Sequence, residues 1–152
     1  MIESRAIQGK PRGFTLIELV VTLFVLALAA SVVAPSVVSG VGTLRARTET
    51  AGIATFLRAA REKAVTHNRT YEVRVKSEEG IVELRAGNTI PATRRLASGL
   101  RVTAEPAAAQ VITFLPQGLS SGSRLHVEMA GRGYLITVDP LTGRVATRRA
   151  DR

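Results

Sequence analysis

The sequence predicts an α+β fold in which one long N-terminal helix packs its second half on antiparallel β-sheet. Apolar residues dominate positions 14–34, and helical spacing of apolar residues continues to position 64. From residue 71 onward the pattern alternates residue by residue, which is typical of half-buried strands. Because the helical pattern precedes all of the strand pattern, helix and strands are expected to form separate layers. About a hundred residues follow the apolar segment, enough for one domain with a buried core.

Residues 1–13 form a basic leader in which three cations stand against the single acid Glu3; the cations are Arg5, Lys10 and Arg12. Cationic segments stay on the cytoplasmic side of a membrane, so the C-terminus is expected to be exported. Residues 14–34 carry no charge except Glu18 and would span about 31 Å as a helix, close to the hydrocarbon core of a bilayer. One transmembrane helix is therefore predicted for residues 14–34.

A cleavable secretory signal peptide is the alternative for this segment, because Ala27-Leu28-Ala29 has the small-x-small form of a cleavage site. Glu18 argues against that alternative, since a carboxylate in an apolar helix is costly in lipid and needs a partner. The chain has no cysteine, which excludes a lipid-anchored lipoprotein and a disulfide framework.

Residues 35–68 are predicted to continue the helix beyond the membrane. Its apolar face comprises Ile53, Phe56, Leu57, Ala60 and Ala64, and the cations expected to face water are Arg45, Arg47, Arg58, Arg61 and Lys63. The helix is expected to end near His67 and Asn68, because the strand pattern begins directly afterwards.

Residues 69–152 are predicted to form a β-rich periplasmic domain. The first two strands are expected to be joined by Ser77-Glu78-Glu79-Gly80, which is typical of a turn. The predicted strands are 71–76, 81–84, 100–103, 111–115, 125–129, 134–138 and 145–148. Residues 86–109 carry the weakest pattern, and no strand is predicted between positions 84 and 100.

The junction Gly13-Phe14-Thr15-Leu16-Ile17-Glu18 resembles the processing site of the type IV pilin and pseudopilin superfamily. In that superfamily the leader ends in Gly, and the mature chain begins with Phe and has Glu as its fifth residue. The resemblance implies that a prepilin peptidase of the inner membrane cleaves between Gly13 and Phe14 and methylates the new amine of Phe14. It also implies that Glu18 pairs with the N-terminal amine of a neighbouring subunit during assembly, which neutralises a charge otherwise stranded in lipid.

Two later segments resemble a narrower family, the H-type minor pseudopilins of type II secretion and the related FimT-type minor pilins (GspH/FimT-like). Ile112-Thr113-Phe114-Leu115-Pro116-Gln117-Gly118 is similar to the strand-and-turn signature of that family. Asp139-Pro140-Leu141-Thr142-Gly143-Arg144-Val145 is similar to its closing hairpin. Each segment holds a proline and a glycine suited to a tight reversal of the chain. The resemblance covers nearly the whole chain and implies a pilin-like fold.

No catalytic, cofactor or metal site is predicted, and we expect a protein that is not an enzyme. His67 and His126 lie far apart in the sequence, and their expected places are a helix end and a strand face. Glu78-Glu79 lies on a turn with no histidine beside it, so these acids are expected to be solvated. Residues 118–122 approximate a nucleophile elbow, but a β-rich chain lacks the strand–turn–helix setting that this motif requires.

The chain carries a net charge of +9, and residues 45–152 hold 18 Lys and Arg residues against 10 acids. Arg144, Arg148 and Arg149 make the C-terminal tail the most basic segment and are the candidate DNA contacts. Some FimT-type pilins that take up DNA carry a Gly-Arg-x-Arg motif at this hairpin, whereas here the second arginine is replaced by Ala146. The basic surface is also compatible with a solvated face, with anionic lipid or with an acidic partner.

These observations favour a structural minor pseudopilin of a type II secretion system, assembled into or capping a periplasmic filament that drives protein export. Its expected partners are other pseudopilins or pilins, the prepilin peptidase, the inner membrane and secreted cargo; no cofactor is expected. The alternative is a minor type IV pilin that binds DNA through its basic tail for DNA uptake. A third hypothesis, a membrane-anchored binding domain outside any filament, predicts an uncleaved leader.

Overall fold

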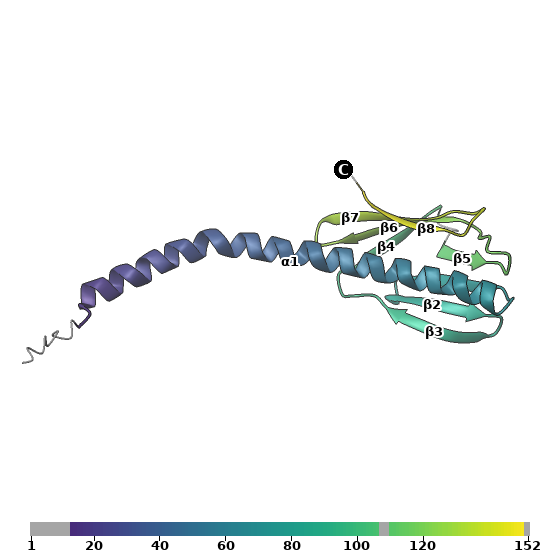
Figure 1. The fold of residues 1–152 in the computed structure, drawn as a ribbon, viewed down its shortest axis with the longest axis horizontal. Helices are drawn as coiled ribbons and strands as arrows, with labels where there is room; N and C mark the ends of the chain where they lie inside the picture. Colours follow the sequence, from purple (N-terminus) through teal and green to yellow (C-terminus); the bar gives the residue numbers. More distant parts are fainter. Residues whose placement is uncertain (1–12, 107–109, 151–152) are drawn as a thin grey trace, which may run out of the picture. The chain divides into compact units, whose positions relative to one another are not determined.

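A computed structural model describes residues 13–106 and 110–150, without the side chains of residues 32–40. The chain divides into two compact units, Met1–Ser39 and Gly40–Arg152. Helix α1, Leu16–Thr66, contributes to both units. In the described part of the chain eight strands follow α1, and all of them belong to the second unit (Figure 1).

The strands form two four-stranded antiparallel sheets. The first sheet has the order β3-β2-β1-β5 and consists of β1 (Tyr71–Lys76), β2 (Ile81–Ala86), β3 (Thr89–Arg95) and β5 (Val111–Phe114). The second has the order β4-β6-β7-β8 and consists of β4 (Arg101–Glu105), β6 (Ser123–Met129), β7 (Arg132–Val138) and β8 (Val145–Arg149). The predicted α+β fold, with a long helix packed on antiparallel sheet, is confirmed.

The second half of α1 ends as the sequence predicts. The helix stops at Thr66, and Asn68 then takes a left-handed backbone conformation with a φ of 48°. Asparagine tolerates that conformation better than most residues, so it is suited to reversing the chain after a helix. The imidazole Nδ1 of His67 lies 2.8 Å from the hydroxyl of Tyr71, which joins the helix end to the first strand.

The chain crosses between the two sheets after β3. Strand β1 lies in the middle of the first sheet, where Val73 is opposite Leu84 of β2 and Ile112 of β5. Strand β4 instead joins the second sheet, where Val102 is opposite Val127 of β6. The first sheet is therefore completed only after the chain has contributed a strand to the second.

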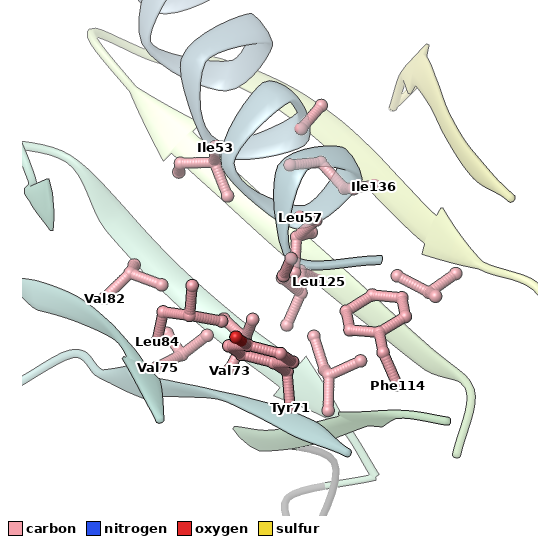
Figure 2. Close-up of a cluster of buried hydrophobic side chains, with 14 of the residues drawn as sticks. Ile53, Leu57, Tyr71, Val73, Val75, Val82, Leu84, Phe114, Leu125 and Ile136 are labelled. Carbon is pink, nitrogen blue, oxygen red and sulfur yellow. The ribbon is translucent and has the colours of Figure 1, made fainter. Parts of the chain in front are cut away.

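One core joins the helix to both sheets (Figure 2). Ile53 and Leu57 of α1 are fully buried, between Val73 of the first sheet and Leu125 and Ile136 of the second. The inward residues of the strands alternate with polar ones, as the burial of β1 and β6 shows. All residues of this core lie between positions 53 and 138, so the second unit holds its own hydrophobic core.

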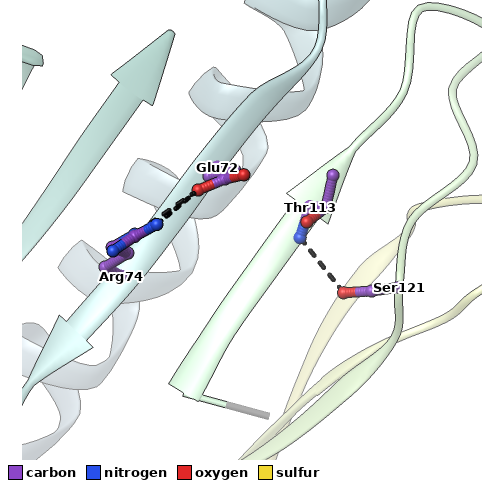
Figure 3. Close-up of polar contacts among 4 residues, drawn as sticks. All are labelled: Glu72, Arg74, Thr113 and Ser121. Carbon is purple, nitrogen blue, oxygen red and sulfur yellow. Dashed lines mark hydrogen bonds and ion pairs between the residues drawn. The ribbon is translucent and has the colours of Figure 1, made fainter. Parts of the chain in front are cut away.

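The outer edge of β5 is covered by the segment that follows it. The amide of Thr113 donates to the hydroxyl of Ser121 at 3.1 Å, and the amide of Ser121 donates to the carbonyl of Thr113 at 2.9 Å (Figure 3). On the neighbouring strand β1, Arg74 and Glu72 form an ion pair at 3.1 Å, with both side chains well exposed. Covering an edge strand in this way removes unpaired backbone groups that would otherwise attract another chain.

Candidate functional site

The residues at the predicted processing site lie at the start of α1. Gly13 and Phe14 precede the helix and are exposed, while the predicted leader before them lies outside the described residues. Thr15 caps the helix: its hydroxyl accepts a hydrogen bond from the backbone N–H of Glu18 at 3.3 Å. Glu18 is thus an exposed acid in the first helical turn, where the helix dipole favours a negative charge.

Large apolar side chains of the first unit are exposed all along the helix from Leu16 to Leu28. Residues of this kind normally need cover from lipid or from another protein. In the described part of the chain, no helix is long and apolar enough to qualify as a membrane span. The transmembrane helix at residues 14–34 includes residues 32–34, whose side chains are outside the described part, and it stays a prediction.

The two motif segments of the second unit, residues 112–118 and 139–145, meet in space through Gly118 and Gly143 and through Ser120, which follows the first segment. The amide of Ser120 donates to the carbonyl of Pro140 at 2.9 Å, and the hydroxyl of Ser120 donates to the carbonyl of Asp139, also at 2.9 Å. Gly118 and Gly143 both have positive φ, and a Cβ added at Gly143 would overlap the carbonyl oxygen of Gly118. Position 143 therefore requires glycine for two reasons, the positive φ and the lack of room for a Cβ.

Asp139 organises the turn between β7 and β8. Its carboxylate accepts hydrogen bonds from the amide and hydroxyl of Thr142, both at 2.8 Å, and from the amide of Leu141 at 3.1 Å. These bonds, that of the Thr142 hydroxyl above all, hold the pKa of Asp139 below its ordinary value because they favour the charged carboxylate. The hairpin expected at residues 139–145 is present, and its acid has a structural role.

Two arginines of α1 bind the start of β8 and the turn before it. Arg58 donates from Nη2 to the carbonyl of Val145 at 3.1 Å, and Arg61 donates from Nε to the carbonyl of Thr142 at 3.0 Å. The prediction that both side chains face water is therefore incomplete. Each guanidinium donates a hydrogen bond to a backbone carbonyl that is distant in the sequence. No local sequence pattern indicates such a contact, since both partners lie in another part of the sequence.

These parts enclose a surface groove of about 760 Å³ at the C-terminal end of α1. Its lining is rich in arginine and glycine and includes one acid and two valines; it comprises Arg58, Arg61, Glu62, Val65, Thr66, Gln117, Gly118, Gly143, Arg144 and Val145. The groove joins both motif turns to the helix and is the candidate functional site of the second unit.

The three arginines predicted as DNA contacts occupy different parts of the domain. Arg144 lines the groove at the end of α1. Arg149 lines a second hollow of about 720 Å³ together with Arg101 and Arg132. Arg148 is opposite Leu135 on β7 and, as its neighbour in an extended strand, projects from the other side of the sheet to Arg149. All three are exposed, but the structure does not gather them into one patch.

His126 lies on strand β6, as expected, and its Nε2 is 2.9 Å from a carboxylate oxygen of Glu105 on β4. Within the described residues, no group of three or more His, Asp and Glu side chains is placed to hold a metal ion. The assignment of the chain as a non-enzyme is not tested by this geometry and stays a prediction.

A capped helix with an uncovered apolar first half, followed by a domain that packs two antiparallel sheets on the second half, defines a subunit of the type IV pilin class. The chain belongs to the family of the type II transport protein GspH, whose model matches residues 49–142. The model of the prokaryotic N-terminal methylation motif matches residues 9–34. Membership of this family implies a membrane-anchored subunit that assembles with other pilins into a filament.

Solved structures agree with this fold. The type IV minor pilin FimU of Pseudomonas aeruginosa is 16% identical, with a TM-score of 0.58 over 68% of this chain and 88% of FimU. The minor pseudopilin EpsH from the Type 2 Secretion System of Vibrio cholerae is 14% identical, with a TM-score of 0.52 over 71% of this chain and 96% of EpsH. At such identities the likeness concerns the fold alone. No curated protein matches the sequence.

Proposed function

We propose that this protein is a structural minor pseudopilin of a type II secretion system, built into or capping a periplasmic pseudopilus that drives protein export. The observation that carries the proposal is the presence, in one chain and in this order, of the methylation motif at residues 9–34 and the GspH domain at residues 49–142. The function is assembly rather than catalysis, with other pseudopilins as partners and secreted protein as cargo.

The N-terminal segment is proposed to be processed before assembly. A prepilin peptidase would cleave between Gly13 and Phe14 and methylate the amine of Phe14, with the leader in the cytoplasm and the C-terminal domain in the periplasm. The exposure of Gly13 and Phe14 ahead of the helix supports access by a peptidase. Residues 14–34 would then hold the subunit in the inner membrane until it enters the filament.

Glu18 is proposed to guide that step. In lipid an unpaired carboxylate is costly, and the N-terminal amine of a neighbouring subunit would neutralise it. The structure adds a second role, because the backbone of Glu18 takes part in the cap of α1 through Thr15. Replacement of Glu18 by Ala keeps that backbone contact and removes only the charge, so it separates the two roles.

The proposal is tested by co-expressing the chain with a prepilin peptidase and the major pseudopilin of its own system. Intact mass is expected to show loss of residues 1–13 and addition of one methyl group, and the processed chain is expected in isolated filaments. The Glu18→Ala variant should insert into the membrane normally but be absent from filaments. Retention of Met1 in the membrane-inserted protein would instead favour the anchored binding domain, and normal incorporation of Glu18→Ala would remove the assembly role.

The second candidate is a minor type IV pilin that binds DNA for uptake. The fold, which is similar to that of the type IV minor pilin FimU, is compatible with this candidate, and the observation that favours it is the exposure of Arg144, Arg148 and Arg149. Their dispersal over two hollows and one sheet face limits how many phosphates a single duplex could contact at once. Binding through so few phosphates is expected to be weak and to have only a shallow dependence on salt, because the slope scales with the number of phosphates contacted.

Fluorescence anisotropy with duplex DNA, across a salt series, separates the two candidates. The protein is the fragment of residues 44–152, which contains the whole hydrophobic core. The control carries Ala at Arg144, Arg148 and Arg149. Tight binding that falls with salt and disappears in the control would favour the DNA-uptake pilin. Absence of binding near physiological salt would leave the secretion pseudopilin.

A further inference from the structure

The groove at the C-terminal end of α1 carries three arginines against one acid, Glu62. We propose that it docks an extended acidic segment of another protein subunit, with carboxylates on its arginines. The inference rests on the proposed function in one respect: a filament subunit acts through contacts with other proteins.

The cations of the groove are Arg58, Arg61 and Arg144. Within the described residues none of the three forms an ion pair, whereas other cations of the domain, such as Lys76 and Arg94, do. Arg58 and Arg61 each use one nitrogen on a backbone carbonyl, and a guanidinium has five N–H groups. Fixing an arginine in this way pre-organises its remaining donors, which match the geometry of a carboxylate.

Part of the groove is lined by glycine. Gly118 and Gly143 line it, and Nη2 of Arg61 lies 3.1 Å from the position of a Cβ at Gly118. A Cβ at Gly143 would overlap the carbonyl of Gly118 and the side chain of Arg61, and a Cβ at Gly118 would crowd the guanidinium of Arg61. The two glycines therefore let both turns pack closely against Arg61 and hold it in the groove.

The acid Glu62 and the exposed Val65 of the groove favour a peptide over a nucleic acid. Glu62 lines the same groove and also lacks an ion-pair partner among the described residues. Duplex DNA carries a negative charge about every 1.7 Å of its axis, so Glu62 would repel it. A peptide can place its carboxylates on the arginines, direct an N–H group toward Glu62 and pack an apolar side chain on Val65, which is 46% exposed.

The test measures binding of a fluorescein-labelled peptide of eight residues with alternating Asp and Leu to the full chain in nonionic detergent. A peptide with the same label and with Asn in place of Asp is the probe that lacks side-chain carboxylates. Arg144→Gln is expected to weaken binding of the acidic peptide about tenfold, the value of one charge-assisted hydrogen bond. Arg148→Gln is the matched control, because it removes the same charge outside the groove, and it should change the affinity less than about twofold.

A third variant tests whether the electrostatic potential of the groove attracts the acidic peptide. Glu62→Gln removes the one acid of the lining and is expected to strengthen binding of the acidic peptide by about 2–5-fold. Melting curves of each variant by circular dichroism would show whether it is folded. The side chain of Arg144 makes no hydrogen bond to another described residue and contributes only the smallest of the effects that lower the pKa of Asp139, so Arg144→Gln is expected to change stability little.

Three results would overturn the inference. Equal weakening by Arg144→Gln and Arg148→Gln would show attraction to overall charge, and equal binding of the Asn peptide would show that carboxylates are not recognised. Tighter binding of duplex DNA than of the peptide, lost in Arg144→Gln, would assign the groove to nucleic acid. None of these results bears on cleavage at Gly13 or on entry into filaments, so failure here is distinguishable from failure of the proposed function.

Discussion

The two halves of α1 are built from similar apolar residues but differ in what covers them. Leu23 and Leu26 in the first half are 58% and 59% exposed, whereas Ile53 and Leu57 in the second half are 0% exposed. The chain supplies two sheets for the second half and nothing among its described residues for the first. Apolar surface on that scale is stable only when lipid or other helices cover it. The second half therefore stabilises the fold, and the first half is available for contacts outside the chain.

The largest effect expected from this comparison concerns two leucines. Leu57→Ala should lower the free energy of unfolding by about 2–5 kcal/mol, because it leaves a cavity between the helix and both sheets. Leu26→Ala makes the same chemical change in the first half and should alter that free energy by less than about 0.5 kcal/mol. Urea denaturation of the full chain in detergent, followed by the β-sheet signal in circular dichroism, measures both. Comparable losses for the two variants would show that the first half is also part of the folded core.

A smaller effect is expected at the turn between β7 and β8, which binds the C-terminal end of α1 through Arg61. Gly143→Ala places a Cβ against the carbonyl of Gly118 and the side chain of Arg61, whereas Gly80→Ala meets only open space. Both glycines have positive φ, of 60° and 65°, so both variants lose roughly 1–2 kcal/mol from the backbone. Gly143→Ala should lose roughly 1–3 kcal/mol more from overpacking. Equal losses in thermal melts would show that Arg61 and the turn move apart without cost.

Two glycines of α1, Gly42 and Gly52, allow the packing at the start of the buried half of the helix to be tested. Gly42→Ala is expected to stabilise the domain by about 0.5–1 kcal/mol, because alanine favours the helix and its Cβ would lie 3.5 Å from Ala130. Gly52→Ala should gain less, since its Cβ would displace the guanidinium of Arg94, which pairs with Glu49 at 3.2 Å. The free energy of unfolding is measured for both glycine variants, once with Arg94 intact and once combined with Arg94→Ala. If Gly52→Ala gains as much as Gly42→Ala while Arg94 is intact, the ion pair contributes nothing.

The smallest effect concerns pH and Asp139. Because the folded pKa of Asp139 is lowered, its carboxylate stabilises the fold above its unfolded pKa of about 3.9, and this contribution is lost as pH falls through the folded value. Asp139→Asn keeps an oxygen acceptor but cannot titrate. Its melting temperature should fall less steeply than that of the wild type below about pH 4. Parallel curves for the two proteins would assign the acid sensitivity to other carboxylates.

Local pattern was sufficient for most of the elements. The end of α1 and seven strands follow from a change of period and from turn residues such as Asn68. Strand β3, Thr89–Arg95, was not predicted because its residues are mostly exposed and polar and include Pro91, which is tolerated only at a sheet edge. The pairing of β5 with β1 could not be predicted from local pattern either, because it joins two strands that are far apart in the sequence.

The candidate site was predictable in its parts but not in its assembly. The two motif segments and Arg144 are visible in the sequence, and each segment forms the turn expected of it. Their contact through Gly118 and Gly143 and the involvement of Arg58 and Arg61 are long-range, so neither follows from spacing along the chain. The strand alternation of Arg148 and Arg149, in contrast, follows directly from the geometry of a β-strand.

The hydrogen bonds that join Arg58 and Arg61 of α1 to β8 and the turn before it have a consequence for the order of folding. Arg58 and Arg61 bind carbonyls 87 and 81 positions further along the chain. Closing such long loops is entropically slow, and it cannot begin before the C-terminal residues are available. In a chain synthesised from its N-terminus, the helix would stay without these contacts until residue 145 had emerged. Attachment of the helix to β8 and to the turn before it is thus a late step in the folding of the domain.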